Sequence, residues 1–179
     1  MANSCCFDYF QTSWARSPRK DTAVKIVLQR VTNASVTIDE KRIAAIGPGL
    51  LLLLGVHIND TGAEADFLAD KCAVLRIFTD ENGKMNRSLV DVGGAALVVS
   101  QFTLLGDCTK GRRPSFIAAA EPEKGDALYR HFVNRLKTHI MDVQTGIFGA
   151  MMQVELVNDG PVTLVLERSN GPTQGNLHP

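Results

Sequence analysis

The sequence predicts a single α/β domain, built from short strands and two main helices. Its 179 residues are the length of one ordinary domain, and 45% hydrophobic with 21% charged residues is the balance of a folded globular chain. Runs rich in β-branched residues also alternate with stretches whose apolar residues recur at helical spacing. Such a chain can bury a core without disulfides or metal ions.

Four strands are expected to open the domain. Residues 24–31, 34–39 and 42–46 carry β-branched residues in short runs, and residues 50–56 form an apolar run typical of a buried strand. This last run is far shorter than the roughly 20 residues of a membrane-spanning helix, so no membrane segment is predicted.

The first helix is expected to begin at Thr61. This residue is a candidate N-cap, and Glu64 three residues later completes a capping box. Five apolar residues then fall on one helical face: Ala65, Leu68, Ala69, Cys72 and Leu75. A second helix is expected over residues 122–140.

Strands are expected around and after these helices. Residues 80–83 are a turn signal, residues 96–102 have the pattern of a core strand, and residues 151–157 and 162–166 form two closing strands. The short link between the closing strands leaves open whether they pair as a hairpin.

The two ends lack any apolar period. Residues 1–23 are interpreted as a flexible extension and residues 169–179 as a flexible tail, which leaves residues 24–168 as the domain. Basic residues Arg16, Arg19 and Lys20 leave a mitochondrial-targeting segment as an alternative, although Asp8 and the lack of an amphipathic stripe oppose it.

Charge and cysteine usage limit the class of protein. The net charge is zero, so the chain lacks the overall basic field of proteins that grip long nucleic acids, and any RNA contact should be local. Four cysteines show no CxxC pair and no secretory pattern precedes them, which favours a cytoplasmic location. Acidic residues show no metal-ligand spacing, so neither metal nor cofactor is predicted.

Two segments stand out as candidates for chemistry. The first is Ser100-Gln101-Phe102-Thr103-Leu104, at the end of the predicted core strand. The second is residues 158–163, Asn-Asp-Gly-Pro-Val-Thr, whose X-Pro bond is a candidate cis bond. Either segment alone is also compatible with an ordinary strand–turn–strand.

Together the two segments resemble the signatures of the D-aminoacyl-tRNA deacylase family. The resemblance covers residues 24–167 and extends to five further stretches: residues 29–31, 47–50, 83–86, 110–116 and 148–152. The signatures resemble the strictly D-selective branch and not the related animal-type enzyme with relaxed chirality. The chain departs from the family in its terminal extensions and in Met151, where many members carry a more polar residue.

The resemblance implies the fold and the reaction. The expected fold has layered mixed β-sheets that are partly barrel-like, with two main helices. The expected protein is a homodimer that cleaves D-amino acids, and glycine, from the acceptor end of tRNA. Ser100, Gln101, Phe102 and Thr103 would form the catalytic segment, and Phe148, Gly149, Ala150 and Met151 the wall that receives the amino group and side chain. A plain core strand is the alternative for this wall.

The resemblance also implies how a D-aminoacyl ester is distinguished from an L-aminoacyl ester. The two esters contain the same atoms, so only a rigid obstacle placed by geometry can separate them. In the family, the Gly-Pro pair reaches into the partner's pocket, which here implicates Gly160 and Pro161. Arg30 resembles the family arginine that holds this selector. A surface arginine that flanks a strand is its alternative.

Three questions stay open at the level of sequence. Thr103 is a candidate nucleophile, yet no histidine shows a spacing that ties a base to it, so main-chain donors and the neighbouring ribose hydroxyl are the favoured source of catalysis. The basic cluster Lys110, Arg112 and Arg113 is a candidate tRNA site or a solvated loop. DNA-unwinding-element binding, or a dimerisation module with a dead pocket, are the alternative functions.

Overall fold

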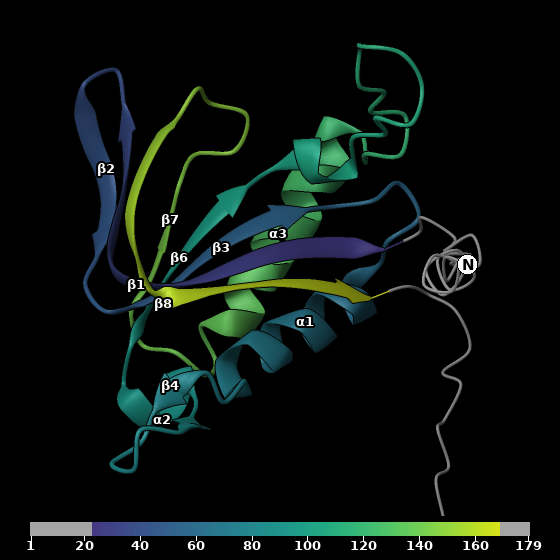
Figure 1. Ribbon diagram of the computed structural model, residues 1–179. Coiled ribbons are helices and arrows are strands. Elements are labelled where there is room, and N and C mark those ends of the chain that lie inside the picture. The colour runs from purple at the N-terminus through teal and green to yellow at the C-terminus, as the bar shows by residue number, and fades with distance from the viewer. Residues whose placement is uncertain (1–22, 169–179) are drawn as a thin grey trace, which may run out of the picture.

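The computed structural model describes residues 23–168, and the expected extension and tail lie almost wholly outside them. A six-stranded mixed sheet forms the centre, in the order β2-β1-β3-β6-β7, with β8 paired to β1 (Figure 1). The strands are β1 (Val24–Ile38), β2 (Lys41–Ile46), β3 (Gly49–Gly55), β6 (Ala95–Ser100), β7 (Val143–Thr145) and β8 (Gln153–Arg168). The expected mixed sheet with two main helices is confirmed.

Two of the expected strand boundaries are wrong for the same reason. β1 is one strand of 15 residues where two were expected, and β8 is one strand of 16 residues where two closing strands were expected. The two strands pair antiparallel from Val24–Arg168 to Thr37–Gln153, with register shifts between Gln29 and Asn33. The register shifts accommodate the residues that interrupt each strand pattern, so each strand stays continuous and no hairpin forms within β8.

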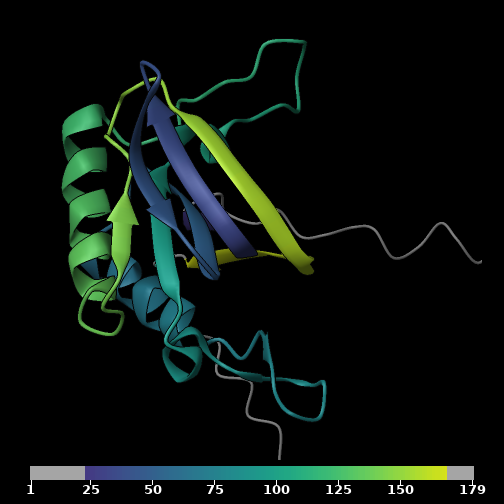
Figure 2. The same cartoon turned by 90° about the vertical axis from the view of Figure 1, so that its left-hand side faces the viewer.

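Two apolar layers hold the sheet. One face packs against the helices α1 (Gly62–Val74) and α3 (Pro122–Leu136), with Phe132, Leu68 and Leu28 in the shared core. On its other face the sheet curves around a second apolar cluster, which includes Val36, Leu97 and Val99, and this curvature makes it barrel-like. Figure 2 shows α3 standing beside the curved strands.

The helix starts agree with the sequence, and the ends are shorter. Thr61 caps α1, and both bonds of the capping box with Glu64 are present. The helix α3 ends at Leu136, not at Ile140. The strand β6 ends at Ser100, not at Phe102, because residues Phe102–Leu105 form a 3-10 helix, η1. The short elements β4 (Phe78–Thr79), β5 (Met85–Arg87) and α2 (Leu89–Val92) were not predicted.

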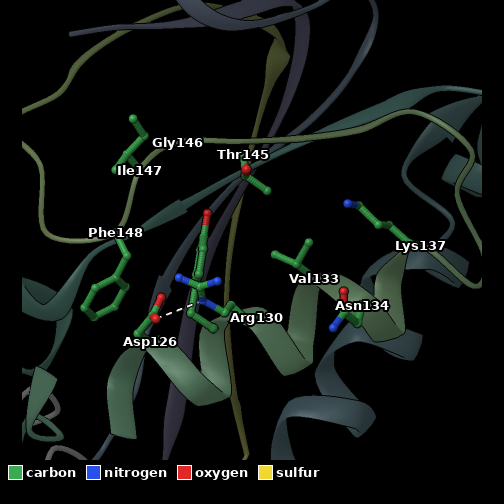
Figure 3. Close-up of a pocket in the computed structure, with 10 residues that line it drawn as sticks. Asp126, Arg130, Val133, Asn134, Lys137, Thr145, Gly146, Ile147 and Phe148 are labelled. Atoms are coloured by element: carbon green, nitrogen blue, oxygen red, sulfur yellow. Dashed lines mark hydrogen bonds and ion pairs between the residues drawn. The ribbon is translucent and has the colours of Figure 1, made fainter. Parts of the chain in front are cut away.

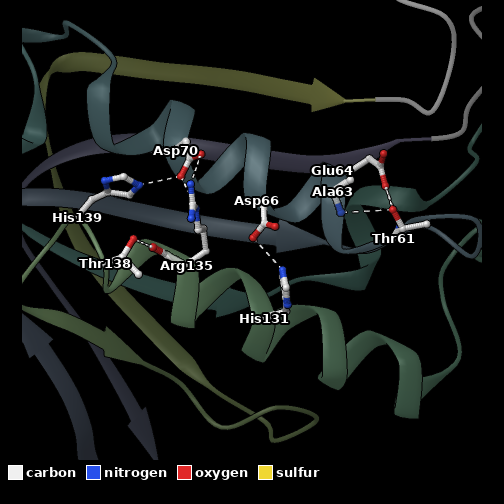
Figure 4. Close-up of polar contacts among 9 residues, drawn as sticks. All are labelled: Thr61, Ala63, Glu64, Asp66, Asp70, His131, Arg135, Thr138 and His139. Atoms are coloured by element: carbon white, nitrogen blue, oxygen red, sulfur yellow. Dashed lines mark hydrogen bonds and ion pairs between the residues drawn. The ribbon is translucent and has the colours of Figure 1, made fainter.

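Polar contacts join α1 to α3 on their outer side (Figure 4). The carboxylate of Asp70 accepts hydrogen bonds from Nε and Nη2 of Arg135 at 2.7 and 2.8 Å, and Nε2 of His139 lies 2.7 Å from it. Arg135, followed by His139, lowers the pKa of Asp70 to about 2. Asp66 pairs with His131 one turn earlier. These contacts fix α3, which carries one wall of the site below.

No helix in residues 23–168 has both the length and the apolar character needed to cross a bilayer.

Candidate active site

A cavity of about 310 Å³ lies where β6 ends, and both the 148–152 segment and η1 border it. Its lining comprises Leu54, Val56, Val99, Ser100, Gln101, Phe102, Ala120, Gly125, Tyr129, Phe148, Gly149, Ala150, Met151, Met152 and Val154. Two segments that are about 50 residues apart in the sequence and were singled out from it therefore meet at one cavity. Neither Gly160 nor Pro161 lines it in the single chain.

The sheet positions the first segment. β6 runs parallel to β3 with Ser100 opposite Leu54, and the Gln101 N–H donates to the Leu54 carbonyl at 2.7 Å. The chain then turns into η1. Phe102 and Thr103 begin this helix, so their N–H groups have no acceptor within it. Two neighbouring main-chain donors are therefore left without a helical acceptor, one on Phe102, which lines the cavity, and one on Thr103, which follows it and does not.

Gly55 allows η1 to approach β3 closely. A Cβ at this position would lie 2.5 Å from Cδ2 of Leu105, and 3.0 Å from both the Gln101 carbonyl oxygen and Cβ of Leu104. The glycine thus sets the depth at which the η1 backbone sits against the strand. The side chain of Gln101 also contacts its neighbour, with Nε2 donating to Oγ1 of Thr103.

The opposite wall is a turn, so the alternative of a plain core strand is wrong. Residues 146–152 connect β7 to β8, with Gly149 at φ +75° and the Ala150 N–H donating to the Ile147 carbonyl at 3.2 Å. The ring of Phe148 packs near Tyr129, with centroids 6.0 Å apart. Met151 is 91% exposed, so its side chain stands at the cavity mouth.

Sequence reasoning missed the contribution of α3. Gly125 and Tyr129 line the cavity, and the Tyr129 hydroxyl donates to the Val98 carbonyl at 2.8 Å. Burial raises the pKa of Tyr129 to about 12, so its hydroxyl stays protonated and is a poor general base. Nothing distinguished either residue in the sequence, because both fall on the apolar stripe of an ordinary amphipathic helix.

The cavity carries no side chain suited to acid–base chemistry near neutral pH. Its lining includes no Asp, Glu, His, Lys or Cys. Among the described residues there is also no group of three or more His, Cys, Asp or Glu placed to hold a metal ion. The polar groups available are main-chain N–H donors, the Ser100 hydroxyl and the Gln101 amide, which suit a substrate that already contains a reactive bond.

The Gly160–Pro161 segment lies in the middle of β8, and its peptide bond is cis. Arg30 holds it from β1: Nε donates to the Asp159 carbonyl at 3.2 Å and lies 3.0 Å from the Asp159 carboxylate. Nη1 of Arg30 donates to the Ile77 carbonyl. Arg30 is only 8% exposed, so the alternative of a surface arginine is wrong.

Asn158 braces the same segment from the other side. Its Oδ1 accepts from the Val162 N–H at 2.9 Å, and its Nδ2 donates to the Val162 carbonyl at 3.2 Å. The tip at Gly160 and Pro161 is itself exposed. The segment is thus held from two sides, exposed at its tip, and absent from the cavity lining of its own chain.

The basic cluster does not line the cavity. Lys110, Arg112 and Arg113 are exposed in the long loop between η1 and α3, within a part of it that is closed by two main-chain hydrogen bonds between Asp107 and Ser115. The three side chains make no hydrogen bond or ion pair to any residue in the range 23–168. A solvated loop and a phosphate-binding loop are therefore both compatible with the structure.

The chain is similar in sequence to one described protein family and to several curated proteins. The family model described as D-Tyr-tRNA(Tyr) deacylase matches residues 27–167. A D-aminoacyl-tRNA deacylase from Shouchella clausii is 53% identical over 80% of this chain and 99% of the relative. One from Roseiflexus castenholzii is 58% identical over 87% and 99%.

A solved structure described as c-Myc DNA Unwinding Element Binding Protein is also similar. It is 42% identical, with a TM-score of 0.77, and the match covers 80% of this chain and 98% of that one. The family match runs through every segment that borders the cavity.

Proposed function

The chain belongs to the D-Tyr-tRNA(Tyr) deacylase family, and from this we propose that it hydrolyses the ester bond of D-aminoacyl-tRNA and of mischarged glycyl-tRNA. Water is consumed, and free tRNA and the amino acid are released. The carrying observation is a cavity that offers main-chain donors and lacks a side-chain base. This arrangement suits an ester, which is already activated relative to an amide.

Catalysis is assigned to the segment from Ser100 to Thr103. Water attacks the ester carbonyl, and the N–H groups of Phe102 and Thr103 donate to the oxygen that becomes negative. The neighbouring hydroxyl of the terminal ribose assists in proton transfer, which replaces the missing protein base. A Thr103 nucleophile is not favoured, because no base lines the cavity and the Gln101 amide already donates to the Thr103 oxygen.

Selectivity is assigned to Gly160 and Pro161 of a second copy of the chain. Their carbonyl oxygens would occupy the space that an L side chain needs, while glycine and D side chains fit against Gly149, Ala150 and Met151. The position of the segment supports this assignment: it is braced by Arg30 and Asn158, exposed at its tip, and does not line the cavity of its own chain.

A homodimer is therefore part of the proposal. Among the described strands β8 pairs only with β1, which leaves its other edge open. Val157 and Val165 on the same strand are 52% and 64% exposed. An open strand edge with exposed valines beside the selector is a suitable surface for a second copy.

The remaining roles follow from the substrate. The loop with Lys110, Arg112 and Arg113 is proposed to contact phosphates of the acceptor end, and the cytoplasm, where tRNA is used, is the proposed location. DNA-unwinding-element binding is not favoured, because relatives at 53% and 58% identity are named deacylases. A dead pocket is not favoured either, since both motif segments are present.

Purified protein is expected to release amino acid from D-tyrosyl-tRNA and glycyl-tRNA and to leave L-tyrosyl-tRNA charged. The physical reason is that only the L side chain meets the obstacle. The measurement is the acid-precipitable radiolabel that remains on each tRNA with time, against spontaneous hydrolysis without protein. Comparable rates on both enantiomers would rule out the selector, and no rate on any of the three would contradict the proposed function.

A further inference from the structure

A second cavity, of about 430 Å³, adjoins the candidate active site along α3 (Figure 3). Tyr129 and Phe148 line both cavities, so their rings form the partition between them. The remaining lining is Asp126, Arg130, Val133, Asn134, Lys137, Thr145, Gly146 and Ile147. Its size is within the range that holds a small ligand or one unit of a larger one.

The second cavity is polar and cationic, in contrast to the first. Arg130 and Asn134 lie one turn apart on one face of α3, and Lys137, its C-cap residue in helical conformation, continues that face three residues later. In Figure 3 the guanidinium of Arg130 and the ammonium of Lys137 both extend over this cavity, from its two ends. The cavity therefore presents two positive charges with an amide between them, and one carboxylate, that of Asp126, which pairs with Arg130.

The hydrogen-bonding capacity of these side chains is largely unused. Nε of Arg130 donates to Oδ2 of Asp126 at 2.8 Å, which orients the guanidinium and leaves its two terminal nitrogens without a protein acceptor in residues 23–168. Within the same range, neither the Lys137 ammonium nor the Asn134 amide makes a hydrogen bond or an ion pair. A planar guanidinium held at Nε presents its free nitrogens in the geometry that suits a phosphate.

We propose that this cavity binds the sugar-phosphate backbone of the acceptor strand just before the terminal nucleoside, with Arg130 and Lys137 as the phosphate ligands. The inference rests on the proposed function. An ester held at η1 fixes the terminal nucleoside at the first cavity, and the strand leads away from it past the wall formed by Tyr129 and Phe148. The second cavity lies directly across that wall, and Asn134 can donate to a base edge or ribose hydroxyl there.

The test compares two substrates that differ in phosphate. D-tyrosyl-tRNA contains the acceptor strand, whereas the D-tyrosyl ester of adenosine contains the same reacting bond without any phosphate. Lys137→Ala removes a charge that has no protein partner, and Arg130→Gln keeps a donor for Asp126. Lys71→Ala, which removes an exposed cation in the last turn of α1, is the matched control.

Each cavity variant is expected to raise KM for D-tyrosyl-tRNA about 10-fold with kcat unchanged, the scale of one charge-assisted hydrogen bond. The slope of log KM against log salt concentration should become less steep by roughly 0.7 per lost phosphate contact. Hydrolysis of the adenosine ester should stay at the wild-type rate. Lys71→Ala should match the wild type on both substrates.

Two outcomes would overturn the inference. Equal losses on both substrates would mean that the variants act through the Phe148 partition on the first cavity, and unchanged KM on tRNA would mean that the cavity takes no RNA. A wild-type protein that hydrolyses neither substrate would instead contradict the proposed function. Binding of uncharged tRNA, which must be weaker for both cavity variants than for Lys71→Ala, decides the inference even then.

Discussion

Gly160→Ala is expected to lower the ratio of D- to L-tyrosyl-tRNA hydrolysis about 100-fold, the loss that a misplacement of about 1 Å produces at a reacting centre. A Cβ on Gly160 would lie 2.7 Å from Nη2 of Arg30 and 2.9 Å from Cγ2 of Val162. Its φ of +123° is also one that L side chains rarely adopt. The segment must therefore shift, and the carbonyl obstacle shifts with it. Initial rates on the two enantiomers give the ratio.

Gly83→Ala is the matched control for this variant. Gly83 also has a positive φ, +75°, but a Cβ there would meet nothing within 4 Å, and it lies in the β4–β5 turn. It should lose some stability, as Gly160→Ala does, and keep full selectivity. A Gly160→Ala protein that folds normally and still spares L-tyrosyl-tRNA would show that this segment is not the obstacle.

Gly55→Val is expected to lower the rate on D-tyrosyl-tRNA about 100-fold while the protein still folds. The valine would press against Leu105 and against the Gln101 carbonyl, which a Cβ alone would already approach to 3.0 Å. The backbone of η1 must move outward, and the N–H donors of Phe102 and Thr103 move with it. Overpacking of this kind costs about 1–3 kcal/mol of folding free energy, so thermal unfolding is measured beside kcat/KM.

Gly47→Ala is the control for the second variant, because a Cβ at Gly47 would meet nothing within 4 Å. Its activity should equal that of the wild type. If Gly55→Val is as active as Gly47→Ala, the placement of the η1 backbone does not govern the rate, and a side chain must supply the catalysis instead.

Features with a local cause were predictable from the sequence. Thr61 and Glu64 determine the start of α1, because their side chains accept hydrogen bonds from the first N–H groups without help from the rest of the fold. The two motif segments were also found from local pattern: the first follows a core strand, and the second carries a Gly-Pro pair inside an otherwise strand-like run. The meeting of residues 100–102 with residues 148–152 at one cavity could not be derived from local pattern, since residues about 50 positions apart give no local signal.

Features with a tertiary cause were not predictable. β8 is continuous through Gly160 and Pro161 only because β1 supplies partners on both sides of the irregularity. Phe102 looked like the end of a core strand, but the chain turns into η1 once β3 stops giving it a partner. Arg30 lies in a strand that buries alternate residues, and its burial depends on Asp159 and Ile77, more than 40 residues away.

A mixed dimer tests most directly whether one protomer completes the pocket of its partner. Gly160→Ala and Gly55→Val chains are co-expressed with different affinity tags and purified through both. The single working pocket then belongs to the Gly160→Ala chain, and the intact selector belongs to the other. Hydrolysis of D-tyrosyl-tRNA with L-tyrosyl-tRNA spared is the predicted result, whereas hydrolysis of both enantiomers at similar rates would show that each chain guards only its own pocket.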